Sequence, residues 1–104
     1  MEMPTNHSTV LAGRLAALAH PARLDILRHL AEMECCCCKD VVSRLDLAQS
    51  TVSQHLKVLV DAGLVRLTPN GQRSLYAIDR EALAGLSTSF GELLSTCCAP
   101  GAKR

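Results

Sequence analysis

Three neighbouring patterns predict a mainly α fold with a small β-hairpin, arranged as a winged helix-turn-helix. Apolar residues at helical spacing over about 37–45 are followed by a turn at 47–50 and by a second helical pattern that stops at Ala62-Gly63. Apolar alternation then continues on both sides of Asn70-Gly71, a strong hairpin signal. Two short helices joined by a tight turn make a helix-turn-helix, and the hairpin after them makes the wing.

Further helical patterns flank this unit. The first covers about 9–19 and is ended by His20-Pro21, and the second covers about 21–33 and is followed by a break over 32–36. Gln49 or Ser50 is expected to cap the recognition helix. We expect strands at 64–67 and 73–78 with a turn at 68–72, and a last helix from Asp79 to just before Pro100. The chain is therefore predicted to be one domain, residues 1–104, with an ordered core over 9–98 and short flexible ends.

Composition narrows the class of protein. The chain has 104 residues, of which 48% are hydrophobic, and a formal net charge of +1, so any charge that binds nucleic acid must be local. No leader pattern opens the chain and no apolar run approaches 18 residues, so we expect a cytoplasmic protein that does not enter membranes. No Ser/His/Asp set, phosphate loop or carboxylate pair is evident, and the sequence predicts no enzyme.

The predicted recognition helix carries a polar face without carboxylates in its N-terminal half. Short hydroxyl and amide side chains of this kind suit hydrogen bonds to base edges and phosphates, and the hairpin adds groups that can hold phosphates. The predicted contacts to double-stranded DNA are Gln49, Ser50, Thr51, Ser53, Gln54, His55, Lys57, Arg66, Asn70, Gln72 and Arg73.

Six cysteines stand in two clusters, Cys35 to Cys38 and Cys97-Cys98. A disulfide framework is disfavoured because no secretion signal is present and because adjacent cysteines form strained disulfides. Reduced thiols that bind soft metals or metalloids, or that sense oxidants, fit better. One or two of the quartet are compatible with simple packing in the core.

Three segments carry a resemblance to a known family. LAHPARLDIL at 18–27, QSTVSQHLKVL at 49–59 and AGLV at 62–65 resemble the arsenical-resistance repressor (ArsR/SmtB) family over roughly residues 9–98. The resemblance implies a homodimeric repressor, paired through its first and last helices, that sits on a palindromic operator until an inducer binds. Apolar stripes at Leu11 and Leu15 and at Leu83, Leu86 and Phe90 independently support a two-fold dimer.

Sulfur chemistry favours trivalent arsenic or antimony as the inducer. Trivalent arsenic takes three sulfurs, whereas zinc takes four ligands at spacings that adjacent cysteines match poorly. The resemblance implies a Cys-x-Cys-Asp motif that falls on Cys37 and Asp40, with Lys39 in place of the second cysteine, and other arsenic sensors of the family use a terminal cysteine pair. The predicted ligands are Cys97 and Cys98 as the indispensable pair, Cys37 as the third, and Cys35, Cys36 and Cys38 as alternates.

The arrangement of these ligands, within one subunit or across a dimer, stays open. Adjacent side chains on a helix point about 100° apart, so a helical run of four cysteines cannot aim all its sulfurs at one ion. Two alternatives keep the fold but change the inducer: a thiol redox or persulfide signal, or zinc or cadmium. A metal-buffering protein would need only the quartet and would not need the polar face. Among the histidines, His20 is expected to be structural, His29 solvated and His55 in contact with DNA.

Overall fold

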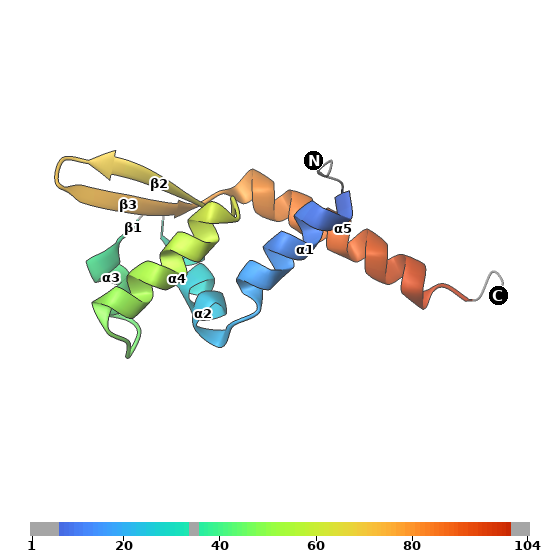
Figure 1. The fold of residues 1–104 in the computed structure, drawn as a ribbon, viewed down its shortest axis with the longest axis horizontal. Coiled ribbons are helices and arrows are strands. Elements are labelled where there is room, and N and C mark those ends of the chain that lie inside the picture. The colour runs from blue at the N-terminus through green and yellow to red at the C-terminus, as the bar shows by residue number, and fades with distance from the viewer. Residues whose placement is uncertain (1–6, 34–35, 101–104) are drawn as a thin grey trace, which may run out of the picture.

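The structure is a computed structural model and describes residues 7–33 and 36–100. Its elements in chain order are α1 (His7–Leu18), α2 (Pro21–Glu32), β1 (Cys36–Cys37), α3 (Cys38–Val42), α4 (Gln49–Asp61), β2 (Val65–Asn70), β3 (Arg73–Ile78) and α5 (Arg80–Cys98). Figure 1 shows α3, α4 and the hairpin at one end of an elongated molecule, with α5 running away from them past α1. The molecule measures 56 × 34 × 22 Å, and the predicted winged helix-turn-helix is confirmed.

Local chemistry explains where the helices begin and end. The His20 ring accepts the Ala22 N–H at 3.0 Å and Pro21 occupies the first turn of α2, so the predicted break lies where expected. Helix α4 ends at Asp61, with Ala62 as its C-cap, because the next residue, Gly63, adopts φ +80°, which suits glycine. The expected cap at Gln49 or Ser50 is wrong by one or two residues. Ala48 is the N-cap, because its backbone carbonyl accepts the first helical hydrogen bond, from the Val52 N–H at 3.0 Å. No side chain caps this end of the helix.

The wing is longer than the sequence predicted. Strand β2 continues to Asn70, which pairs with Arg73, so the turn contains only Gly71 and Gln72. Gly71 has φ +66°, a conformation that a two-residue hairpin turn requires. The sheet order is β1-β3-β2, so β2 is an edge strand, and Pro69 is accommodated there because an edge strand does not need every N–H.

Cys36 and Cys37 form a strand, whereas the sequence predicted a break at Cys36 and the start of a helix at Cys37. Cys36 and Cys37 form β1, which pairs antiparallel with β3 opposite Tyr76 and Leu75. Helix α3 then begins at Cys38 and is shorter than the predicted 37–45 helix. Cys35 lies outside the described residues. Cys36 and Cys37 therefore belong to the same sheet as the wing.

One core joins the helices to the sheet. The fully buried side chains include Ile26 and Leu30 of α2, Val52 and Leu56 of α4, and Leu64 before the wing. The apolar stripe of α5 is only partly buried in this core: Leu86 is buried, whereas Phe90, Leu93 and Leu94 are 36%, 46% and 46% exposed.

None of the described helices is both long enough and apolar enough to cross a membrane.

Candidate nucleic-acid interface and thiol sites

The exposed face of α4 contains four of the predicted DNA contacts. Gln49, Ser50, Gln54 and Lys57 are exposed, and the hairpin residues Arg66, Asn70, Gln72 and Arg73 are exposed beside them. Thr51, Ser53 and His55 are half-buried, and of these Ser53 and His55 contact other protein side chains, Cys38 and Arg23. The helix and the wing therefore offer amide, hydroxyl and cationic groups on adjoining elements (Figure 1).

His55 faces the protein because of its position in the helix. It lies three residues after Val52 and four before Leu59, both fully buried, so it shares the edge of their face. Its Nδ1 is 3.3 Å from Arg23 Nη1, and its ring centroid is 4.5 Å from that of His20. Burial lowers the pKa of His55, and the charges of His20 and Arg23 lower this pKa further. These contacts tie the recognition helix to the start of α2.

The cations of this surface differ in what they already contact. Lys57 Nζ lies 3.2 Å from Asp61 Oδ2, and both side chains are mostly exposed. Arg66 Nε lies 3.4 Å from Asp79 Oδ2. Arg73 instead donates from Nη2 to Cys37 Sγ at 3.2 Å. Arg73 is thus the wing arginine that contacts a thiol rather than a carboxylate.

Cys37 stands between Arg73 and a carboxylate. Both its backbone N–H, at 3.1 Å, and its thiol, at 3.3 Å, donate to Asp40 Oδ2. The backbone hydrogen bond from Cys37, followed by that of its thiol, lowers the pKa of Asp40. The hydrogen bond to Cys37 is also the main reason why the pKa of Arg73 is raised. A three-residue polar chain therefore joins α3 to the wing through one sulfur.

The neighbouring cysteines have separate surroundings. Cys36 is buried in the core, and its Sγ lies 3.8 Å from Nε2 of His29. His29 is itself only 8% exposed, so the expectation that it is solvated is wrong. Cys38 is half-buried, with its Sγ 3.4 Å from Ser53 Oγ of the recognition helix. Packing thus accounts for Cys36, while Cys38 faces α4.

A polar cavity of about 620 Å³ opens between α4 and the wing. We call it the wing pocket. The residues that line the wing pocket come from β1, α3, α4 and the hairpin: Cys37, Cys38, Lys39, Gln49, Ser53, Gln72, Arg73, Ser74 and Tyr76. Burial raises the pKa of Tyr76, and the charge of Cys38 adds to this effect. Two thiols and four predicted DNA contacts therefore share one cavity.

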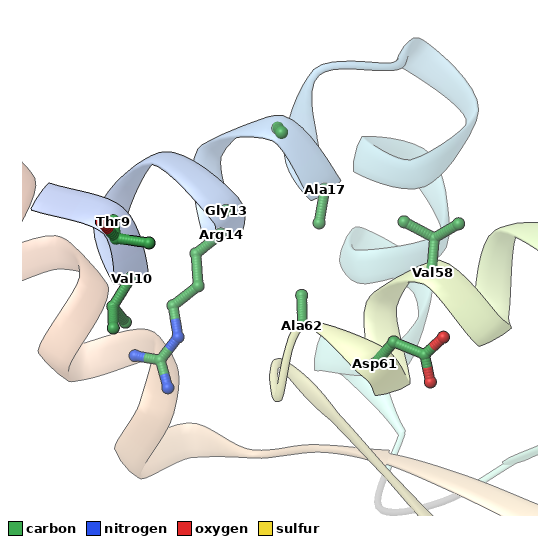
Figure 2. A pocket seen from close by; sticks show the side chains of 9 residues that line it. Thr9, Val10, Gly13, Arg14, Ala17, Val58, Asp61 and Ala62 are labelled. Carbon is green, nitrogen blue, oxygen red and sulfur yellow. The ribbon is translucent and has the colours of Figure 1, made fainter. Parts of the chain in front are cut away.

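A second cavity, of about 550 Å³, lies between α1 and the end of α4. Figure 2 shows that mainly small and apolar side chains line it, such as Ala17, Ala62 and Val58, together with Arg14 and Asp61. None of the described residues that line it is a cysteine.

The terminal pair lies far from Cys36, Cys37 and Cys38. Cys97 and Cys98 are exposed in the last turn of α5, at the opposite end of the long axis from α3 (Figure 1). Cys37 and this pair therefore cannot bind one ion within a single subunit. Within residues 7–33 and 36–100, no group of three His, Cys, Asp or Glu side chains is placed to hold a metal ion.

Comparison with known proteins identifies the family. Residues 18–68 match a helix-turn-helix domain family. The arsenical resistance operon repressor of Staphylococcus xylosus is 39% identical over 69 residues, 66% of this chain and 65% of that protein. The corresponding repressor of Bacillus subtilis is 34% identical over 73 residues, 70% of each chain. The chain belongs to the arsenical-resistance repressor (ArsR/SmtB) family.

A solved structure of an ArsR family protein also matches the fold of this chain. A crystal structure of an ArsR family transcriptional regulator superposes with a TM-score of 0.77 at 21% identity, covering 94% of this chain and all of that one. The matched segments span about two thirds of the two repressors named above. The predicted family is thus confirmed, and it is a family of DNA-binding transcriptional repressors rather than enzymes.

Several residues of this ArsR/SmtB site were missed by sequence reasoning. Ser74 and Tyr76 line the wing pocket, and Lys39 lines it too, although the sequence singled out Lys39 only as the replacement for a cysteine. The hairpin alternation could have indicated that Ser74 and Tyr76 share a face of β3. The pairing of β1 with β3 has no comparable signal, because two residues are too few to show a period.

Proposed function

We propose that the chain is a homodimeric repressor that leaves its operator when trivalent arsenic or antimony binds its cysteine thiolates. Family membership and the adjoining polar surfaces of α4 and the wing support the DNA-binding part. The exposed residues Phe90, Leu93 and Leu94 support the dimer, because an apolar stripe of this kind on a small domain is ordinarily covered by a partner. Helix α1 packs beside α5 and would share that interface.

The choice of inducer rests on the donor set. Thiolates prefer soft ions, and trivalent arsenic takes three sulfurs, of which Cys97 and Cys98 supply a vicinal pair. Both are exposed at a helix end, where their side chains are free to turn toward one ion. The third thiolate would have to come from the partner subunit, with Cys37 of the partner subunit as the first choice. If the pair is dispensable, the quartet is the remaining sensor.

The contact between Cys37 and Arg73 is the observation that best supports a coupling of thiols to DNA. An arginine predicted to hold a phosphate donates at 3.2 Å to a thiol predicted to bind the inducer. Ligation would remove the thiol proton that now bonds to Asp40 and would engage the sulfur that Arg73 contacts. The pairing of β1 with β3 would carry any movement of Cys37 into the wing. A tenfold loss of operator affinity requires only about 1.4 kcal/mol of such coupling.

Cysteine substitutions test the assignment of the thiols. Reduced protein carrying both Cys97→Ser and Cys98→Ser should bind operator DNA and fail to release it in arsenite. X-ray absorption of the wild-type complex should show three sulfurs around arsenic. Oxygen or nitrogen in that shell would defeat the thiolate site. A normal response of the double variant, together with loss of response in Cys37→Ser, would assign sensing to the quartet instead.

A further inference from the structure

We propose that the wing pocket is a modification site, in which Cys38 forms a mixed disulfide with a small anionic disulfide of the glutathione type. Cys38 was predicted only as an alternate arsenic ligand, and the reagent proposed here is of a different chemical class from arsenic. The expected effect of the Cys38 adduct on DNA binding rests on the proposed repressor function, whereas the formation of the adduct does not depend on that function.

Accessibility singles out Cys38 within the described part of the quartet. Cys36 is 1% exposed and lies against His29, and Cys37 is 6% exposed between Asp40 and Arg73. Cys38 is half-buried and lines the pocket wall. Thiol–disulfide exchange requires the attacking sulfur to reach the disulfide, so access selects Cys38 over its neighbours.

Charge and size indicate the class of reagent. Lys39 and Arg73 line the pocket, and among the described residues that line it there is no aspartate or glutamate. Asp40 lies outside that lining and already accepts two hydrogen bonds from Cys37. The volume of about 620 Å³ falls within the range of pockets that hold small organic ligands. A peptide-sized disulfide with carboxylates fits such a cavity better than a cationic one does.

The reaction is an ordinary exchange. The Cys38 thiol gives its proton to solvent, and the thiolate sulfur attacks one sulfur of the reagent. The new bond joins Cys38 Sγ to that sulfur as the S–S bond of the reagent breaks. The leaving half departs as a thiolate with the electron pair, so Cys38 is oxidised and the departing half is reduced. Excess reduced thiol reverses the step.

The position of Cys38 explains why the adduct would matter. Its Sγ lies 3.4 Å from Ser53 Oγ and 4.0 Å from the Gln49 carbonyl oxygen, both on the first two turns of α4. The bound group would occupy the space between that helix and Arg73 of the wing. An anionic group there would exclude a DNA phosphate by both volume and charge.

The test treats the reduced full chain with oxidised glutathione and locates adducts by peptide mass mapping. We expect a glutathionyl group on Cys38, its absence in Cys38→Ser, and at least tenfold weaker operator binding by the modified wild type. Lys39→Gln should slow the reaction with oxidised glutathione about two- to fivefold, the size expected for one exposed charge. It should leave the rate with the uncharged bis(2-hydroxyethyl) disulfide unchanged. Arg28→Gln, which removes an exposed cation of α2, is the matched control and should alter neither rate.

Two results would overturn the proposal. Mapping that finds glutathione on Cys97 or Cys98 and none on Cys38 removes the site. Full modification of Cys38 with unchanged operator affinity removes its regulatory effect. A protein that binds no DNA but is modified at Cys38 would refute the repressor function and leave the site standing, so the two failures are distinguishable.

Discussion

Replacing Arg73 by alanine should weaken operator binding on every DNA sequence and should make that binding less sensitive to salt. Arg73 is exposed on the wing and its guanidinium contacts the Cys37 thiol, whereas Arg66 lies 3.4 Å from the carboxylate of Asp79. Arg73 is therefore the wing arginine better placed to hold a phosphate. Each phosphate contact adds about 0.9 to the slope of log affinity against log salt. If one phosphate contact is lost, the ratio of wild-type to variant affinity should fall about 3.5-fold as the salt concentration rises from about 50 to 200 mM.

Fluorescence anisotropy with a labelled palindromic duplex, at several salt concentrations, measures this slope. Arg73→Lys is the charge-preserving control and should retain the wild-type slope. Gln54→Ala should keep the slope and instead reduce discrimination against the wrong base by about 1–3 kcal/mol. A wild-type slope for Arg73→Ala would refute a phosphate contact at this residue, and the contact with Cys37 would then be its main role.

Two further predictions concern stability. Asp79 accepts the Ala82 N–H at 3.0 Å as the cap of α5, so Asp79→Ala should cost about 0.5–2 kcal/mol in urea unfolding, while Asp79→Asn, which can still cap, should cost less. Because the folded protein holds the pKa of His55 below 6.5, the unfolded chain takes up the proton first as the pH falls. The contribution of His55 to the free energy of unfolding should therefore be fully present above about pH 6.5 and be lost on acidification. In His55→Gln the urea unfolding midpoint should change less between about pH 7.5 and 5.5 than in wild type. A pH profile identical to that of wild type would contradict this role of His55.

The helix-turn-helix and the hairpin could be predicted because their signals are local. The Asn70-Gly71 pair, the proline at 21 and the glycine at 63 each fix the backbone within a few residues. Strand β1 could not be predicted, because Cys36 and Cys37 are held by residues almost forty positions away on β3. The sequence therefore indicated that thiols lie near the recognition helix but not that they belong to the sheet of the wing.

The candidate site was predicted less completely for the same reason. Most of the exposed face of α4 follows from helical spacing, yet the contact of His55 with His20 and Arg23 depends on how α2 crosses α4. The separation of Cys97 and Cys98 from Cys37 depends on the direction of α5, which no local pattern encodes. Cys36 joins the core for a similar reason, because β1 turns it inward against His29.

The most direct test of the central claim measures the affinity of the fully reduced protein for its own operator, with and without saturating arsenite. A repressor released by thiolate ligation should bind the palindromic duplex as a dimer and lose at least tenfold in affinity when arsenite is added, which corresponds to about 1.4 kcal/mol or more of coupling. An affinity that is unchanged in saturating arsenite would contradict the account.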